Sequence, residues 1–243
     1  MITAAAVQQA WTELPVADIG TITGHGRTMI LAPHPDDESL GCGGMIAELC
    51  RLGRPPLVVI VTDGAGSHPA SPSVLAPVLR QLREHEAAAA LRHLGLQDAA
   101  ALVFLRLPDT AAPHQGVDFE TAVARLVQHA AGCETICATW GHDPHCDHEA
   151  VDLMARAVAA RTGLRHLAYP VWGWTLPPET QLPESRVAGW RLDITDALPA
   201  KRAAIAAHRS QHGGLIDDDP GGFTLPAALL HIFERPYEVF LSL

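Results

Sequence analysis

The feature that most constrains the fold is a repeated alternation of short apolar runs with helix-like segments. Apolar runs of four to eight residues are typical of strands buried on both faces. They occur at 28–32, 57–61, 102–105, 135–140 and 164–171, with later strands predicted at 190–194 and 237–243. Helical patterns fall between or after them at 40–52, 78–94, 119–131, 147–161 and 197–208. This alternation predicts an α/β fold, a Rossmann-like three-layer sandwich with a mostly parallel central sheet.

The chain length and composition favour a single domain over residues 1–243. A chain of 243 residues with 48% hydrophobic and 18% charged residues can bury a sizeable core. Two segments rich in loop-forming residues, 65–77 and 175–187, interrupt the pattern. Long loops in a compact domain often carry function, so we expect these two to discriminate between substrates.

Charge and cysteine usage exclude several classes of protein. The 17 basic residues face 27 acidic ones, and this net charge of −10 disfavours nucleic acid as a partner. Five cysteines without a C-x-x-C pair predict no disulfide framework and a cytoplasmic location, with Cys133 and Cys137 as core thiols. Neither a secretory signal nor an apolar run of about 20 residues is found, so no membrane association is expected. The oligomeric state stays open, a homo-oligomer included.

Two clusters of chemistry-bearing residues directly follow predicted strands. The first reads His34-Pro35-Asp36-Asp37-Glu38 and follows the strand at 28–32. The second spans 142–148 (HDPHCDH) and follows the strand at 135–140. Because ligands of parallel α/β sheets bind at the carboxyl ends of the strands, both clusters should project from the same edge.

The residue types in these clusters suit a catalytic zinc site. Zinc takes imidazole nitrogen and carboxylate oxygen, and catalytic sites use three protein ligands and one open position. Iron(II) accepts the same ligands, so both metals stay open. If the first segment is extended, His34 and Asp36 share a side, which favours Asp36 as the ligand, although the chain must turn after Pro35. Asp36, Asp37 and Ser39 also suit helix capping, but two clusters at equivalent strand ends favour a metal site.

Several stretches together resemble the PIG-L/LmbE-like N-acetylglucosaminyl deacetylases. The segment 32–44 (APHPDDESLGCGG) is similar to the signature of that family, and 145–148 (HCDH) resembles its H-x-D-H motif. Weaker similarities follow in the family's order: 83–86 with 94–95, then 107–109, then 201–211. The resemblance covers about residues 29–211 and implies a zinc-dependent deacetylase acting on a small N-acetylated sugar.

The resemblance also implies roles for individual residues. It assigns zinc binding to His34, Asp37 and His148, and it makes Asp36 the general base for the metal-bound water. It implies that His145 stabilises the oxyanion or protonates the leaving amine. The remaining implied roles are orientation of His145 by Asp147 and contacts to sugar hydroxyls by Arg83 and Asp109. Thr110 and Cys146 stand where the family often has Gly and Pro; Cys146 either perturbs the loop, offers a thiolate or packs as an inert small side chain.

Other functions are less well supported by the sequence. The 41–44 segment (GCGG) lacks the G-x-G-x-x-G spacing of a dinucleotide site, and we expect its glycines to allow close helix packing. No G-x-S-x-G elbow of a serine hydrolase occurs. A metal-dependent hydrolase of an ester or phosphoester, and a non-catalytic binding module on the same fold, stay open. Trp172 and Trp174 either pack in a loop or form a platform for a sugar ring.

Overall fold

A seven-stranded, mostly parallel sheet forms the centre of the structure, a computed structural model that describes residues 1–183 and 187–242. Its strand order is β4-β3-β2-β5-β6-β9-β8; β2 to β6 run parallel, and β9 is antiparallel to both β6 and β8. The strands are β2 (Arg27–Ala32), β3 (Leu57–Thr62), β4 (Leu102–Leu107), β5 (Cys133–Thr139), β6 (Arg165–Tyr169), β8 (Gly189–Asp193) and β9 (Tyr237–Ser242). A separate antiparallel pair joins β1 (Ile2–Thr3) to β7 (Gln181–Leu182).

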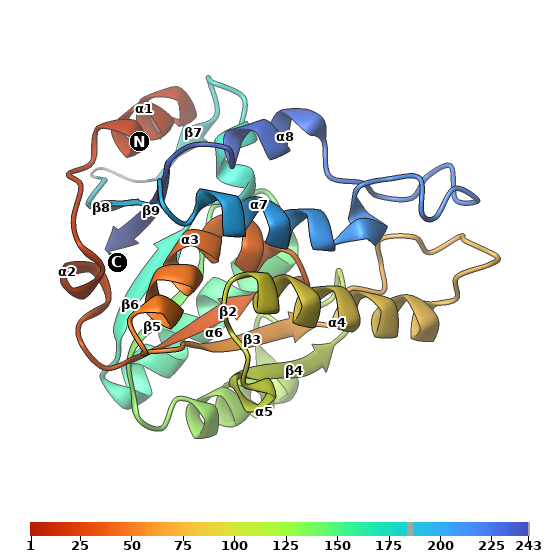
Figure 1. Cartoon of the computed structure of the whole chain (residues 1–243), viewed down its shortest axis with the longest axis horizontal. Helices are drawn as coiled ribbons and strands as arrows, with labels where there is room; N and C mark the ends of the chain where they lie inside the picture. Colours follow the sequence, from red (N-terminus) through yellow and green to blue (C-terminus); the bar gives the residue numbers. More distant parts are fainter. Residues whose placement is uncertain (184–186, 243) are drawn as a thin grey trace.

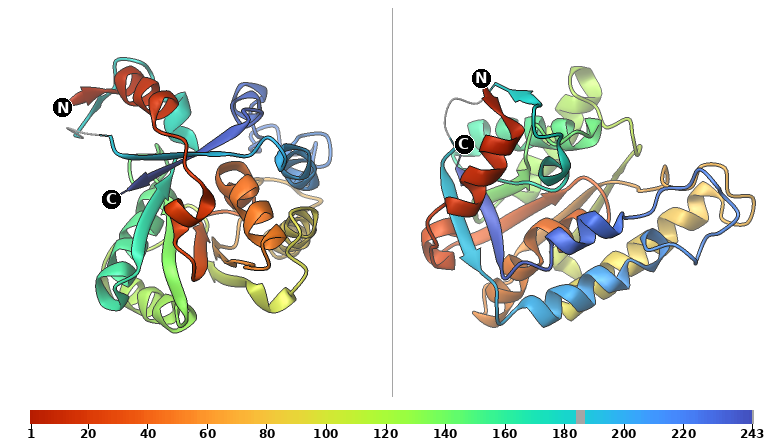
Figure 2. Two further views of the ribbon diagram at one scale, coloured as in Figure 1. Left: turned by 60° about the vertical axis from the view of Figure 1, so that its left-hand side comes forward. Right: turned by 90° about the horizontal axis from the view of Figure 1, so that it is seen from above.

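Helices cover both faces of this sheet, as the alternating sequence pattern predicts (Figures 1 and 2). Successive residues of β2 point to opposite faces: Ile30 packs with one hydrophobic cluster, and Met29 and Leu31 pack with the other. The first face carries α3, α4 and α7, and the second carries α5 and α6. The helices are α1 (Ala4–Glu13), α2 (Ile19–Thr23), α3 (Asp37–Arg51), α4 (Ala76–His93), α5 (Gly116–His129), α6 (Cys146–Thr162), α7 (Leu198–Ala207) and α8 (Ala227–Ile232), with single 3-10 turns at η1 (Ala99–Ala101), η2 (Trp172–Thr175) and η3 (Arg209–Gln211).

The predicted three-layer fold is confirmed, and the differences lie at element ends, in the N-terminal region and after β6. Helix α3 begins at Asp37, three residues before the predicted start, because Asp37 and Glu38 suit the positive end of a helix. The short strand β7 lies within a segment expected to be loop. Strand β1 and helices α1, α2 and α8 were not predicted. Part of the 175–187 loop (184–186) and residue 243 fall outside the described residues.

Close packing of α3 on the sheet depends on two of its glycines. A Cβ atom at Gly41 would lie 2.1 Å from the Tyr169 ring, and one at Gly44 would lie 2.3 Å from Ile194. Tyr169 is fully buried on β6, and its hydroxyl donates to the Leu31 carbonyl at 2.8 Å. The glycines therefore bring the start of α3 close to the strand ends, as expected.

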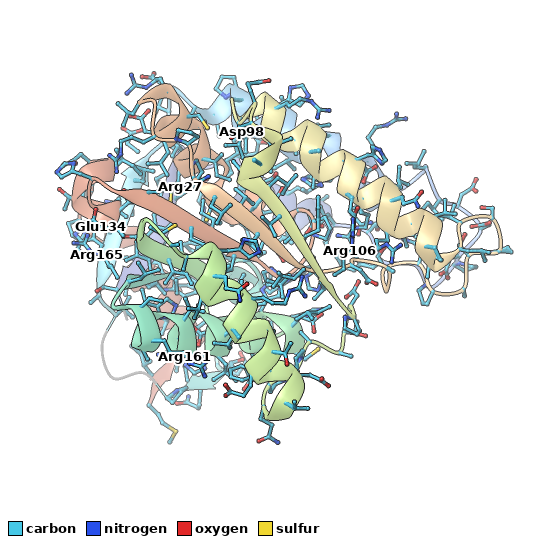
Figure 3. The ribbon with its side chains drawn as sticks, turned by 90° about the horizontal axis from the view of Figure 1, so that it is seen from below. Arg27, Asp98, Arg106, Glu134, Arg161 and Arg165 are labelled. Carbon is cyan, nitrogen blue, oxygen red and sulfur yellow. The ribbon has the colours of Figure 1, made fainter. Side chains whose placement is uncertain are left out.

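Ion pairs at the periphery tie helices to one another and to the sheet (Figure 3). Arg161 of α6 donates to Glu120 of α5 at 2.6 Å, and Arg106 at the end of β4 donates to Glu84 of α4 at 2.7 Å. Glu134 accepts hydrogen bonds from the backbone amides of His25 and Gly26, which fixes the turn before β2. In the part of the chain that the structure describes, no helix is both long and apolar enough to cross a bilayer.

Candidate metal centre

The two predicted clusters meet at the carboxyl ends of neighbouring parallel strands. His34 lies two residues after β2, and the 142–148 segment connects β5 to α6. Strands β2 and β5 are paired, and the chain adds β3 and β4 on one side and β6 on the other, so the sheet order reverses between them. Such a switch point leaves a crevice between the flanking loops. The prediction that both clusters share one sheet edge is confirmed.

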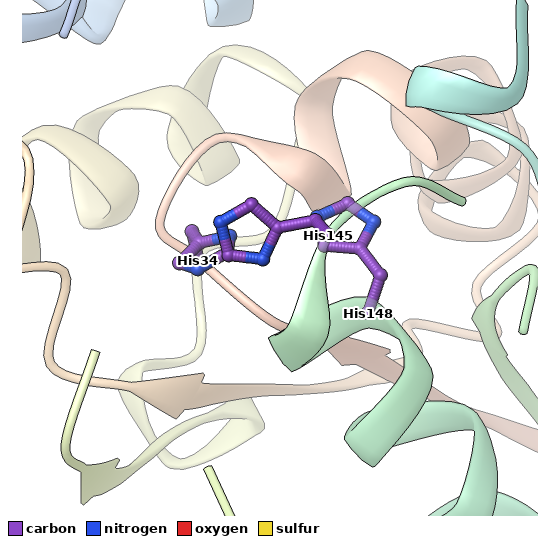
Figure 4. Close-up of side chains that lie close together, drawn as sticks. All are labelled: His34, His145 and His148. Atoms are coloured by element: carbon purple, nitrogen blue, oxygen red, sulfur yellow. The ribbon is translucent and has the colours of Figure 1, made fainter. Parts of the chain in front are cut away.

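Three imidazole rings converge at this edge (Figure 4). The ring centroids of His34 and His148 are 5.5 Å apart. The ring centroid of His145 lies 4.6 Å from that of His34 and 5.2 Å from that of His148. One nitrogen of each ring lies within 4.8 Å of a nitrogen of the other two. Residues more than 100 positions apart in the chain therefore come close enough to share one ion.

Asp37 lies between two of these histidines. Its Oδ2 atom is 3.1 Å from Nδ1 of His34 and 3.3 Å from Nε2 of His148. Ligand atoms held about 2.0–2.1 Å from a tetrahedral zinc lie about 3.3 Å from each other. His148 Nε2 is buried and has no hydrogen-bond partner, so this nitrogen can bind an ion once its proton is released. This donor set fits a zinc or iron(II) ion.

The extended-segment argument that favoured Asp36 as the ligand is not supported by the structure. The chain turns after Pro35, and Asp36 adopts φ 152°, a conformation that side chains other than glycine rarely occupy. As a result, Asp37 faces the histidines, and its Oδ2 also accepts a hydrogen bond from the His34 amide at 3.0 Å. Backbone strain of this kind concentrates at functional sites.

His34 and His148 each contact a second carboxylate through the ring nitrogen that points away from Asp37. Asp147 Oδ2 lies 3.0 Å from Nε2 of His34, and Asp143 Oδ2 lies 3.0 Å from Nδ1 of His148. A carboxylate on the far nitrogen fixes the tautomer and orientation of a metal-binding imidazole. The structure thus gives the Asp147 carboxylate a different partner from the predicted one, because its partners are His34 and the Thr110 and Ala112 amides. The role of Asp143 was missed, although it belongs to the predicted cluster.

The electrostatics of this edge favour a bound cation. Arg83 is the only Lys or Arg among the described residues that line the pocket. Burial lowers the pKa of His148, but Asp37 and Asp143 outweigh it and raise that pKa to about 9. Burial likewise opposes the protonation of His34, yet hydrogen bonds to Asp109, Asp147 and Asp37 hold its pKa well above the ordinary value. The carboxylates that surround the two histidines are Asp36, Asp37, Asp109, Asp143 and Asp147.

Asp36 has the environment of a general base. Burial raises its pKa to about 6, against the opposing charge of Arg83, whose Nη2 lies 3.2 Å away. A carboxylate with a pKa near neutrality can both accept and release a proton. Its strained backbone is held by Glu38, whose Oε2 accepts from the Asp36 amide at 3.0 Å and whose Oε1 lies 3.2 Å from His208 Nε2.

His145 has the environment of a hydrogen-bond donor. It lines the pocket, and its Nδ1 accepts from the Asp147 amide at 3.2 Å. Burial and the neighbouring histidines His34 and His148 lower its pKa to about 4. A neutral imidazole that accepts at Nδ1 carries its proton on Nε2. That proton is free to serve a ligand in the pocket.

The two residues predicted to contact sugar hydroxyls both line the pocket, but they also hold protein groups. Arg83 is buried, and its terminal nitrogens donate to the Gly64 and Pro35 carbonyls and to Asp36. Asp109 lies 3.3 Å from His34 Nε2 and accepts from the Gly66 amide at 2.8 Å. Among the side-chain polar atoms of these two residues, only Arg83 Nε has no hydrogen-bond partner. Their described contacts therefore position Asp36 and His34.

Thr110, which follows Asp109, stands where the family often has glycine, and its backbone has a conformation that favours glycine. Thr110 adopts φ 63°, a left-handed conformation that favours glycine, and its amide donates to Asp147 at 2.7 Å. Cys146 is exposed, its Sγ lies 3.5 Å from the Thr110 carbonyl, and burial and Asp147 raise its pKa. Its thiol is therefore protonated at neutral pH.

The pocket beside His34 and His145 is lined by two kinds of side chain, polar and apolar. Its cavity volume is about 170 Å³. Its lining includes polar residues, called here the polar wall (Gly66, Ser67, Asp109, Thr110), and apolar residues, called here the apolar wall (Leu40, Trp172, Phe223, Leu225). Trp174 does not line it but packs against Trp11 and Arg235. Gln211 also lines the pocket with a buried, unpartnered Oε1, an acceptor that the sequence analysis did not identify.

Comparison with known proteins gives the same family as the sequence motifs. A family model described as PIG-L, GlcNAc-PI de-N-acetylase, matches residues 29–159, more than half of the chain. The chain is 28% identical over 156 residues to a 2'-N-acetylparomamine deacetylase of Streptomyces fradiae, covering 59% of this chain and 56% of that relative. It thus spans little more than half the length of that protein.

Two longer matches agree with this result. A probable N-acetyl-alpha-D-glucosaminyl L-malate deacetylase 2 of Bacillus cereus is 26% identical over 196 residues, covering 79% of this chain and 86% of the relative. The solved structure of the N,N'-diacetylchitobiose deacetylase from Pyrococcus horikoshii is 20% identical, with a TM-score of 0.65, and covers 96% of this chain and 88% of its own. At that identity the likeness shows the fold alone.

Proposed function

The chain belongs to the PIG-L family, and we propose that it is a metal-dependent hydrolase that removes the acetyl group from the amine of a small N-acetylated sugar or glycoconjugate. The observation that carries this proposal is the position of Asp37 Oδ2, 3.1 Å from His34 Nδ1 and 3.3 Å from His148 Nε2. That spacing suits three ligands of one tetrahedral ion. The deacetylases among the relatives support the reaction class.

His34, Asp37 and His148 would hold the metal, with zinc and iron(II) as the two candidates. A bound divalent ion supplies Lewis acidity, which polarises a carbonyl group and lowers the pKa of water. Asp147 and Asp143 orient the two histidine ligands from behind. Thus the ring nitrogen of each histidine that would point away from the metal has a carboxylate partner, which orients the ring for coordination.

Asp36 would take the proton from the attacking water, and its raised pKa suits that task. Arg83 and the Glu38–Asp36 hydrogen bond keep the carboxylate in place. His145 would donate from Nε2 to the oxygen that becomes negative as the acetamide carbonyl is attacked. The proton that Asp36 took from the water can then pass to the leaving amine, so that acetate and a free amine are released.

The sugar would bind against the polar wall, where Asp109 and Arg83 line the pocket. Both roles come from the family resemblance, and their described contacts to His34 and Asp36 combine them with positioning of the site. A small-molecule partner also agrees with a pocket lined by apolar side chains and a few polar groups.

The test is release of free amine from a panel of N-acetylated sugars, with and without a chelator. We expect amine and acetate in equal amounts, loss of activity on chelation and recovery on adding zinc or iron(II). Release of phosphate or alcohol from phosphoester or ester substrates, without amine release, would instead indicate another hydrolase. Absence of both bound metal and activity after zinc addition would indicate a binding module.

A further inference from the structure

We propose that the apolar wall of the pocket binds the acyl chain of the substrate, so that the enzyme accepts N-acyl amino sugars whose acyl group is longer than acetyl. This inference rests on the proposed function, since it concerns the amide that the metal site would hydrolyse. It assigns a binding role to Trp172, Phe223 and Leu225, which lie outside the segment 29–159 that matches the family.

The apolar wall extends from the metal site to the pocket rim. At its inner end Leu40 is 1% exposed and lies one helical turn from Asp37. Leu225, 7% exposed, and Trp172 continue it, and the Trp172 ring meets the Phe223 ring edge to face at 5.8 Å. Phe223 is 37% exposed at the outer end. An acetyl methyl group contacts only side chains within about 4.0–4.5 Å, so it cannot reach the whole wall.

The chemistry of the two walls separates the two sides of an amide. The carbonyl carbon must lie by the metal, Asp36 and His145, and it carries an acyl chain on one side and a sugar on the other. Sugar hydroxyls need hydrogen-bond partners, which the polar lining residues Ser67, Asp109 and Thr110 offer. A hydrocarbon chain gains free energy by leaving water, which only the apolar wall provides.

Backbone hydrogen bonds hold this wall in a fixed position. The Trp172 amide donates to Asp143 at 3.1 Å, the Phe223 amide donates to the Ser67 carbonyl at 2.6 Å, and the Leu225 amide donates to the Gln211 carbonyl at 2.7 Å. The aromatic rings are therefore presented by anchored segments, and a preorganised apolar surface binds without a large ordering cost.

The test compares glucosamine carrying N-acetyl, N-propanoyl, N-butanoyl or N-hexanoyl groups, with kcat/KM measured by amine release. For the wild type we expect about a fourfold rise per added methylene up to the butanoyl group, the value of burying one CH₂. Phe223→Ala and Trp172→Ala should flatten this rise. Val117→Ala, at a 77% exposed position on α5, is the matched control and should keep it.

The hexyl glycoside of N-acetylglucosamine separates the acyl side from the sugar side. If kcat/KM rises with this glycoside and not with acyl length, the wall binds the sugar substituent and the inference is wrong. An equal loss for every acyl length in Trp172→Ala would place that ring under the sugar, which also overturns it. Cleavage of N-acetylglucosamine with no gain from longer chains refutes the inference alone, whereas no amine from any substrate refutes the proposed function with it.

Discussion

Two buried clusters of charged groups flank helix α3, and they differ in charge balance. Beside the middle of α3, Lys201 donates to Glu238 at 2.7 Å, and Glu238 also accepts from the Gly44 and Met45 amides. Both side chains are about 2% exposed. At the start of α3, five carboxylates surround the histidines, and Arg83 is the only Lys or Arg among the described pocket residues. In the first cluster the two opposite charges cancel, whereas in the second the carboxylates outnumber the permanent positive charges.

This difference separates a structural ion pair from a binding site. Burying a charge is costly unless a partner and hydrogen bonds compensate it. Lys201 and Glu238 compensate each other, so nothing further is required. At the start of α3, the neighbouring carboxylates raise the pKa of His34 and of His148, so positive charge is stabilised there. A divalent ion would take the place of these protons, which is the usual coupling of metal binding to proton release.

The comparison is tested most strongly by Asp37→Ala. Removing the carboxylate between the two histidines should abolish metal binding and reduce deacetylation to background, because three protein ligands are needed to hold the ion. Metal content by elemental analysis and amine release would be measured on the same preparation. A variant that retains one metal ion per chain would show that the ligand set is different, for example one that uses His145.

The second largest effect is expected for Asp36→Asn. The proposed general base should be lost while the metal stays bound, with a decrease in kcat of about 10²–10⁴-fold. Metal content and kcat would be measured together, with Asp109→Asn as a neighbouring carboxylate change for comparison. Loss of metal in Asp36→Asn with normal metal in Asp37→Ala would exchange the roles of the two residues.

A smaller effect, on stability instead of activity, is expected for Lys201→Met. Glu238 would be left as a buried unpaired charge, which lowers the free energy of unfolding by about 3–5 kcal/mol. Urea denaturation would measure it, and metal content should be unchanged. Lys201→Met combined with Glu238→Gln should recover part of the loss. If the single variant lost its metal, the two clusters would not be independent.

The smallest effect is expected for Ser39→Ala, which lies on α3 at the metal end. Its hydroxyl donates to Glu38 Oε1 at 2.7 Å and lies 3.0 Å from His208 Nε2. Losing this contact should reduce the free energy of unfolding by about 1 kcal/mol, as for one hydrogen bond. Thermal unfolding with and without metal would measure it. A fall in kcat larger than that of Asp36→Asn would contradict the order proposed here.

The parallel sheet and its edge could be predicted because they depend on local patterns. Apolar runs marked each parallel strand, and the clusters that follow β2 and β5 marked the switch point. The N-terminal helix α1 also had a local signal that was overlooked: Thr3 caps it, and Val7 and Trp11 share its buried face. Its burial depends on Trp140 and Trp174, which come from distant parts of the chain.

The details of the site could not be predicted where they depend on contacts between distant segments. Spacing gave no reason to expect φ 152° at Asp36, and that turn decides which of two adjacent carboxylates faces the histidines. The role of Asp143 depends on its position beside the 171–173 backbone. Phe223 and Leu225 reach the pocket from a segment with no recognised motif.

The two carboxylates behind the histidines would couple the proposed ion to the shape of the pocket. Asp147 holds His34 and the Thr110 amide of the polar wall, and Asp143 holds His148 and the Trp172 amide of the apolar wall. Removing the proposed ion should therefore loosen both walls at once. If the ion raises the affinity for a pocket ligand by some factor, that ligand must raise the affinity for the ion by the same factor. Substrate and metal should thus protect each other from dissociation.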